Sequence, residues 1–142
     1  IENNIKFGCP DATHEHKLFD DSEAAHPIEP EEYIPVENIH GKLLLIGAED
    51  DVLWDAARYI HRMEKRLAEK PHECEVETAV YAHGTHFVFP EGMLKIMLPV
   101  GAGLFVRLAF QAAKQFPEAC RQTRQDIDRR VSAAIHTWTS TE

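Results

Sequence analysis

The feature that most constrains the fold is a short, continuous apolar run from Leu43 to Ile46, which is bounded by Gly41 and Gly47. An apolar run of this length without alternation is typical of a strand that is buried on both faces of a parallel sheet. Acidic residues follow the run at once, at positions 49–51. We therefore predict a buried parallel strand that ends in an acidic turn.

A helix and a second strand are predicted to follow. Apolar positions three to four apart indicate an amphipathic helix from about Trp54 to Glu69, which Pro71 ends. The stretch Glu75 to Tyr81 alternates, and we expect Val76 to point inward as part of a second strand. This order predicts parallel strands joined by a right-handed crossover. Two strands are too few for a parallel sheet, so the remainder must come from residues 1–38, a second copy of the chain, or a preceding segment.

The other parts of the chain differ in character. Residues 1–33 are rich in proline and acidic residues, and we expect an extended or loop-rich segment with room for one short helix. Residues 34–142 form the second part, in which an apolar insertion at about 90–116 is broken by proline and glycine and predicts one or two short helices. A closing helix is expected from Pro117 to about Trp138, with Phe116 and Trp138 as its core anchors. Together these patterns predict an α/β fold.

Chemically active residue types follow both predicted strands. Asp50 and Asp51 come just after the first strand, and His86 comes just after the second. Catalytic groups in open α/β sheets lie beyond the carboxyl ends of the strands. An acid and an imidazole that face one crevice predict a carboxylate that orients a general base, as in nucleophilic hydrolases. The order of acid and then histidine matches the Ser…Asp…His order of α/β-hydrolases.

Two motifs carry a resemblance to a known family. Residues 34–54, IPVENIHGKLLLIGAEDDVLW, resemble the pattern IPxExIxGPxLLIxGxDDxxW, and residues 81–90, YAHGTHFVFP, resemble YPxxGHxxxPP. Both patterns are typical of the C-terminal domain of the acyl-CoA thioesterase and bile acid-CoA:amino acid N-acyltransferase family, and the resemblance covers about residues 33–138. It implies the C-terminal part of an α/β-hydrolase, with parallel strands, a crossover helix and a closing C-terminal helix.

The resemblance also implies which residues act. An ungapped alignment from Gly41 through the Asp-Asp-x-x-Trp run makes Asp51 the acid, and the second motif makes His86 the base. The G-x-x-D spacing from Gly47 points to Asp50 instead, and we prefer Asp51 because it uses more matched positions. The sequence departs from the family pattern where proline is usual, at Lys42 and Ala82, and where glycine is usual, at Ala48 and Thr85.

The nucleophile of such a triad is missing from the sequence. There is no G-x-S-x-G motif, and the only serines are Ser22, Ser132 and Ser140. Cys9 is followed by Pro10, which has no N–H to give to an oxyanion hole. We therefore predict a serine-type hydrolase of esters or acyl-CoA thioesters, part of a longer protein, whose nucleophile lies outside this chain. No cofactor is implied, and the expected partner is the N-terminal part of the same hydrolase or a second copy.

An alternative class stays open. A non-catalytic α/β domain would use its sheet edge and the apolar segment 93–110 for association or oligomerisation. A natural start of the chain near Ile1 would favour this alternative, whereas a longer gene product with an upstream G-x-S-x-G would favour the enzyme.

Composition excludes several other classes. The net charge of −9 argues against nucleic acid or an anionic membrane as a partner. Three cysteines without a CxxC motif, and no visible signal peptide, indicate reduced thiols and a cytoplasmic location.

The pairs His14/His16 and His83/His86 have no cysteine partner at zinc-finger spacing, so we predict no metal site. Trp54 and Phe87 are candidates for lining a substrate pocket.

Overall fold

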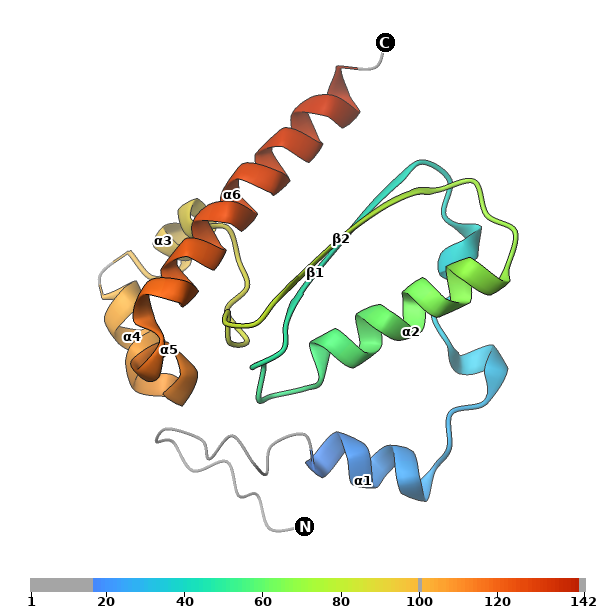
Figure 1. Cartoon of the computed structure of the whole chain (residues 1–142), viewed down its shortest axis with the longest axis horizontal. Coiled ribbons are helices and arrows are strands. Elements are labelled where there is room, and N and C mark those ends of the chain that lie inside the picture. The colour runs from blue at the N-terminus through green and yellow to red at the C-terminus, as the bar shows by residue number, and fades with distance from the viewer. Residues whose placement is uncertain (1–16, 100, 141–142) are drawn as a thin grey trace.

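The computed structural model describes residues 17–99 and 101–140 of the chain. Figure 1 shows the order of the elements along the chain. The elements are α1 (Lys17–Ala25), η1 (Pro30–Glu32), η2 (Val36–Asn38), β1 (Lys42–Ala48), α2 (Ala56–Glu69), β2 (Glu75–Tyr81), α3 (Glu91–Met97), α4 (Ala102–Ala109), α5 (Gln111–Gln115) and α6 (Pro117–Thr139). The described part is thus rich in helix, with one small sheet.

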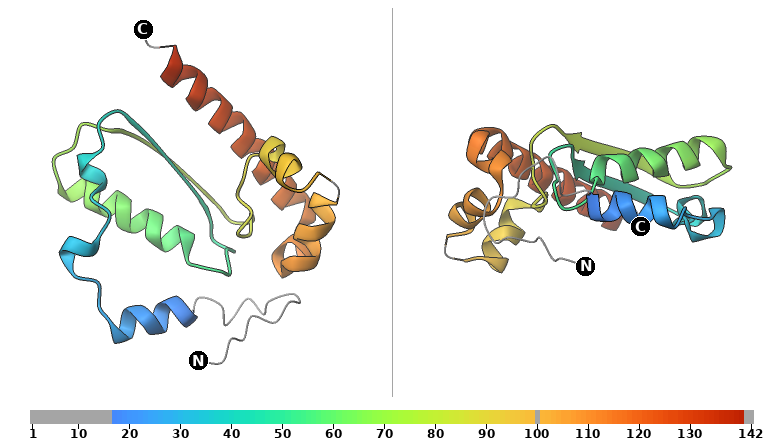
Figure 2. Two further views of the ribbon diagram at one scale, coloured as in Figure 1. Left: turned by 180° about the vertical axis from the view of Figure 1, so that it is seen from behind. Right: turned by 90° about the horizontal axis from the view of Figure 1, so that it is seen from below.

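That sheet consists of two parallel strands among the described residues. β1 and β2 pair in register from Lys42 opposite Glu75 to Ala48 opposite Tyr81. The predicted parallel pairing is confirmed, and β1 extends the predicted apolar run by one residue before it and two after it. Because the strands are parallel and in register, both carboxyl ends reach the same edge of the sheet. Helices α3 to α5 and the start of α6 gather at that end of the strands in all views (Figures 1 and 2).

Helix α2 connects the two strands. It begins at Ala56, two residues later than predicted, because Asp55 is its N-cap and accepts a hydrogen bond from the Arg58 backbone N–H at 2.9 Å. Ile60 is buried against β1. A Cβ on Gly47 would lie only 2.6 Å from Ile60 Cδ1. The glycine that follows the apolar run is therefore what lets this helix approach the strand closely.

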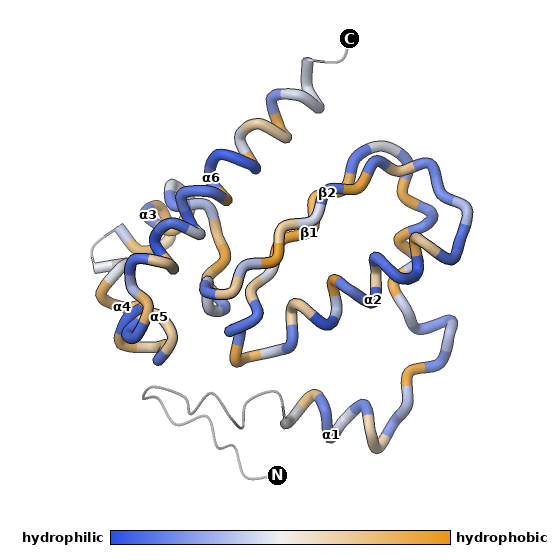
Figure 3. The backbone as a smooth tube through the Cα atoms, viewed as in Figure 1, coloured by the Kyte–Doolittle hydropathy of each residue, from blue (hydrophilic) through white to orange (hydrophobic). Residues whose placement is uncertain are grey.

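The buried residues form two separate clusters. One cluster lies at the start of the strands and consists of Val36, Leu67 and Cys74. The other lies among the helices beyond the strand ends and consists of Val52, Leu94, Val106, Phe110, Ala113 and Cys120. Figure 3 shows hydrophobic residues along β1 and in α4, while much of α6 is hydrophilic. The apolar insertion predicted at 90–116 thus supplies much of the second cluster, in three short helices where one or two were predicted.

Three expected core side chains are exposed. Val76 is 37% exposed, Phe116 44% and Trp138 42%, so the predictions that Val76 points inward and that Phe116 and Trp138 anchor the last helix are wrong. A groove of about 310 Å³ separates the start of the strands from the C-terminal end of α6, and both Val76 and Trp138 line it. These two side chains therefore line an open groove where a core was expected. Phe116 lies at the N-cap of α6 and contacts a loop histidine described below.

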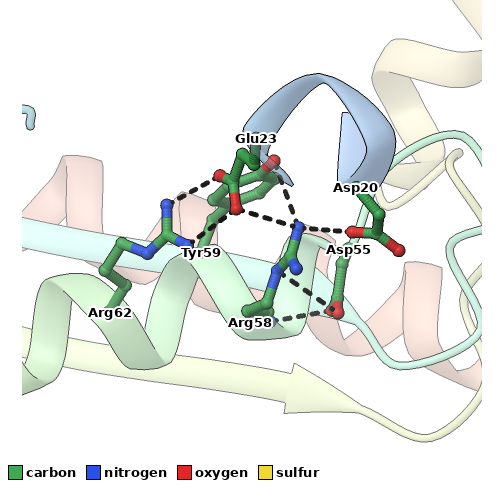
Figure 4. Close-up of polar contacts among 6 residues, drawn as sticks. All are labelled: Asp20, Glu23, Asp55, Arg58, Tyr59 and Arg62. Carbon is green, nitrogen blue, oxygen red and sulfur yellow. Dashed lines mark hydrogen bonds and ion pairs between the residues drawn. The ribbon is translucent and has the colours of Figure 1, made fainter. Parts of the chain in front are cut away.

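Polar contacts hold α1 against α2 (Figure 4). Arg62 donates from Nη1 to Glu23 Oε1 at 2.9 Å and from Nη2 to Glu23 Oε2 at 3.1 Å. Arg58 Nη2 lies 2.8 Å from Asp20 Oδ1. Hydrogen bonds from Arg62 lower the pKa of the Glu23 carboxyl from its ordinary value. Two of the acidic residues near the start of the chain, Asp20 and Glu23, thus form ion pairs that join α1 to α2.

No helix within residues 17–99 or 101–140 combines the length and the apolar character that crossing a membrane requires. The most apolar part of the chain is divided among α3, α4 and α5, and each is far shorter than the span of a bilayer core.

Candidate active site

The candidate site lies where the two strands end. The Glu49 backbone N–H donates to the Tyr81 carbonyl at 2.8 Å, so the chain segments that leave β1 and β2 begin side by side. Asp50 and Asp51 lie on the first segment, and His83 and His86 on the second. The two acids and two histidines singled out from the sequence are therefore brought together by the parallel pairing.

Asp51 faces His86. The His86 Nδ1 atom lies 3.1 Å from Asp51 Oδ2 and 3.3 Å from Oδ1. The Asp51 residue is only 2% exposed, and its Oδ1 also accepts the Leu53 backbone N–H at 3.0 Å. An ionised Asp51 favours the tautomer in which Nδ1 of His86 carries the proton and donates it to the carboxylate. Because the two ring nitrogens lie on opposite sides of the imidazole, Nε2 then points away from Asp51 with its lone pair available as a base.

Asp50 has a different set of partners. Its Oδ1 accepts the backbone N–H groups of Gly84 at 2.8 Å and Thr85 at 2.7 Å. Its Oδ2 lies 3.2 Å from His83 Nδ1. The aspartate that the G-x-x-D spacing favoured thus holds the backbone of the histidine loop, while the aspartate that the ungapped alignment favoured contacts the ring of His86.

The histidine loop needs unusual backbone geometry. Thr85 has a φ of 61°, the left-handed region that glycine favours, and its side chain is fully buried. Its Oγ1 accepts the Phe87 backbone N–H at 3.1 Å. A Cβ on Gly84 would lie 2.7 Å from Val88 Cγ1 and 2.9 Å from Ala48 Cβ. Close packing therefore requires Gly84, and Thr85 occupies a strained position at which the resembling pattern has glycine.

Aromatic rings flank the His86 imidazole. Trp54 meets it edge-on, with ring centroids 4.6 Å apart, and Trp54 is 44% exposed. Phe87 also meets it edge-on at 6.2 Å and continues into contacts with Phe105 and Phe110. The two residues proposed from the sequence as pocket candidates thus both touch the candidate base, and Phe87 connects it to the helical cluster.

Helix α6 supports the loop through contacts that sequence reasoning missed. The Phe116 ring stacks on His83 with centroids 3.9 Å apart and an interplanar angle of 12°. Thr123 donates from Oγ1 to the His83 carbonyl. The Tyr81 hydroxyl donates to Asp126 Oδ2 at 2.7 Å, and burial raises the pKa of Tyr81 to about 12. An aromatic residue directly before a predicted helix start was the one available signal for the Phe116 contact.

Among the described residues, Cys120 is not suited to nucleophilic attack, and no group of side chains is suited to bind a metal ion. Burial raises the pKa of Cys120 to about 11, which makes it a poor nucleophile at neutral pH. Within residues 17–99 and 101–140, no three His, Cys, Asp or Glu side chains gather in a way that could hold a metal ion. Cys9, His14 and His16, which the sequence raised as candidates, lie outside the described residues.

Comparison with known proteins supplies the family. The family model described as "BAAT / Acyl-CoA thioester hydrolase C terminal" matches residues 4–92, more than half of the chain. No curated protein and no solved structure matches. The match includes both loops of the site, but it begins before the expected limit at residue 33 and ends before the expected limit at residue 138, so α4 to α6 lie beyond it. The chain belongs to the BAAT / acyl-CoA thioester hydrolase C-terminal family, whose domain is the C-terminal part of an α/β-hydrolase.

Proposed function

We propose that Asp51 and His86 are the acid and base of a catalytic triad, in an enzyme that hydrolyses an acyl-CoA thioester or a related ester. The observation that supports this best is the pairing of His86 Nδ1 with a buried carboxylate, 3.1 Å from Asp51 Oδ2. Family membership supports an acyl-CoA thioester as the substrate class and an acyl transfer as the reaction class.

The nucleophile in this proposal is a Ser or Cys from outside the 142-residue chain. Among the described residues, Ser22 lies on α1, Ser132 on α6 and Ser140 at the end of α6, and the hydrogen bonds found for His86 there go to Asp51 and to none of these serines. A partner segment that brings its nucleophile to the Nε2 side of the His86 ring completes the triad. Trp54 and Phe87, which flank that ring, then border the acyl or thiol part of the substrate.

The reaction proceeds in two halves. His86 Nε2 accepts the nucleophile's proton as the nucleophile's O or S atom bonds to the thioester carbonyl carbon. The C–S bond breaks, and the imidazolium returns the proton to the leaving thiolate. Water then attacks the acyl-enzyme with His86 again as base, which releases the carboxylic acid and restores the nucleophile. Asp51 fixes the His86 tautomer and stabilises the imidazolium in both halves.

The test is the His86→Ala variant in the protein that carries the nucleophile, with release of free CoA thiol as the measurement. We expect kcat to fall by about 10³-fold or more. His61→Ala is the matched control, because His61 forms an exposed histidine–carboxylate pair with Glu64 at 2.8 Å. The control should change the rate by less than about twofold. A His86→Ala variant with the parent rate contradicts the proposal.

The alternative function, association without catalysis, has one observation in its favour. Large apolar side chains on α3 and α4 are exposed, including Ile96 at 83%, Leu104 at 62% and Leu108 at 65%. Exposed apolar side chains gathered on neighbouring elements are typical of interaction surfaces. Two results together would favour this alternative over the enzymatic proposal. The first is self-association of the chain that Leu108→Asp abolishes, and the second is thioester turnover that His86→Ala does not change.

A further inference from the structure

A second cavity lies among α4, α5 and the start of α6. Its volume is about 370 Å³, and its lining includes Arg107, Arg121 and Arg124, with Glu118 as the one acidic residue. The chain as a whole has a net charge of −9, whereas the three guanidinium groups around this cavity make a local region of positive charge. Such a concentration of donors attracts anions, because charges that line a concave surface reinforce one another.

Arg124 is the fixed member of this group. It is only 7% exposed, and its Nε donates to Glu91 Oε2 at 2.9 Å, which orients the guanidinium plane. No other hydrogen bond of this guanidinium is found within the described ranges 17–99 and 101–140, so its terminal NH₂ groups are available to a ligand. A buried guanidinium with one edge held by protein is pre-organised to bind an anion with its other donors.

The other two arginines can adapt to a ligand. Arg107, in the last turn of α4, is exposed and forms no ion pair with any residue that the structure describes. Arg121 pairs with Glu118 at 2.6 Å, one helical turn away, and the two side chains are 51% and 61% exposed. Exposed pairs of this kind contribute little, so a bound anion can take the place of Glu118 at low cost. Both residues of this pair lie in the first two turns of α6, where the helix dipole also favours negative charge.

The cavity and the candidate active site pack on the same core cluster. Val106, Ala113 and Cys120 line the cavity and also belong to the helical core cluster on which Phe87 packs. Phe87 in turn meets the His86 ring. We propose that this cavity binds phosphoryl groups and, given the proposed function, that they are phosphates of the CoA portion of the thioester. A long ligand would then place its thioester beside His86 and its phosphates among the arginines.

The experiment is calorimetric titration of the chain with CoA, adenosine 3′,5′-bisphosphate, inorganic phosphate and phosphate-free pantetheine. We expect CoA and the bisphosphate to bind, pantetheine not to bind, and affinity to fall as ionic strength rises. Arg107→Ala should weaken binding by about tenfold, the effect of losing one charge-assisted contact. Arg129→Ala is the matched control, because Arg129 is an exposed arginine on α6 that pairs with Asp126 outside the cavity. This control should stay within about twofold of the parent.

The outcomes answer two questions separately: whether the cavity binds phosphoryl groups at all, and whether those groups belong to CoA or to free phosphate. Inorganic phosphate that binds as tightly as CoA, with the same dependence on Arg107, supports a phosphoryl site but assigns it to free phosphate. No binding of any phosphate-bearing probe, or equal weakening by Arg107→Ala and Arg129→Ala, overturns the site. Binding is measured without turnover, so an inactive enzyme that still binds CoA refutes the proposed hydrolysis and leaves the phosphate site standing.

Discussion

Two aspartate–histidine pairs lie side by side at the end of the sheet, and they are built for different tasks. Asp50 and His83 form one pair at 3.2 Å, and Asp51 and His86 form the other at 3.1 Å. Asp50 also accepts two backbone N–H groups of the histidine loop, whereas the nearly inaccessible Asp51 carboxylate contacts the ring of His86. The two consecutive aspartates therefore have different contacts: Asp50 holds the histidine loop, and Asp51 orients the ring of His86.

The surroundings of the two rings differ in the same sense. His83 is covered face-on by Phe116, and its carbonyl accepts the Thr123 hydroxyl, so this histidine is tied to α6. His86 is met by Trp54 and Phe87 at interplanar angles of 83° and 89°, so neither of these two rings stacks on its imidazole. The stacked ring of His83 suits anchoring of the loop, whereas the unstacked contacts of His86 agree with its proposed role in proton transfer.

Asp51→Asn should have the largest effect on this comparison. Asparagine keeps the shape of the side chain but can present its amide to Nδ1, which favours the wrong tautomer of His86. In the enzyme complete with its nucleophile, we expect kcat to fall by about 10⁴-fold with thermal stability nearly unchanged. Steady-state thioester hydrolysis measures the first quantity and calorimetry the second. Combined with His86→Ala, the loss should be far less than additive, and additive losses would contradict a shared role.

Asp50→Asn is the neighbouring substitution with the opposite profile. It removes the charge that strengthens the hydrogen bonds from Gly84 and Thr85, so the free energy of unfolding should fall by about 2 kcal/mol. The rate should fall by about tenfold at most, because the His86 ring keeps its own carboxylate. Denaturant unfolding of the 142-residue chain measures the stability. A catalytic loss as large as that of Asp51→Asn would mean that the two aspartates have been assigned the wrong way round.

Phe116→Ala should act on one pair and spare the other. Loss of the stacked ring should lower the free energy of unfolding by about 1 kcal/mol. In imidazole NMR spectra, the resonances of His83 should shift while those of His86 stay in place. Ile135→Ala, which removes an exposed apolar side chain of α6 from elsewhere on the helix, should move neither histidine. Equal shifts at both rings would show that the two pairs respond as one unit.

Local signals explain what the sequence could predict. The apolar run predicts β1 and the apolar periodicity predicts α2, although the cap at Asp55 was missed and the helix start was placed two residues early. Parallel strands bring their carboxyl ends together, so the approach of Asp51 to His86 followed. The contacts of Asp50 could not be foreseen, since the direction of each side chain in a tight turn depends on backbone angles that composition does not define. The same holds for Phe116, whose partner lies 33 residues away in the sequence.

The exposed side chains show a different limit. Val76 alternates with polar neighbours as a half-buried strand should, yet it lines a groove because the C-terminal end of α6 does not close over the start of the strands. Periodicity predicts which residues share a face, but whether another element covers that face is decided by tertiary placement. The bounds of β2 were therefore predicted correctly, but the burial of Val76 within it was not.

Thr85 offers the smallest and most specific test, because its residue lies between the two histidines in a conformation that favours glycine. Thr85→Ala keeps the left-handed strain and loses the hydroxyl that accepts the Phe87 N–H, whereas Thr85→Gly loses the same contact but relieves the strain. We expect the glycine variant to be more stable than the alanine variant by about 1 kcal/mol, as measured by denaturant unfolding. At Ala133 in α6 the order should reverse, with Ala133→Gly about 1 kcal/mol less stable than the parent. If alanine is the more stable residue at both positions, the loop does not store the strain that its φ of 61° implies.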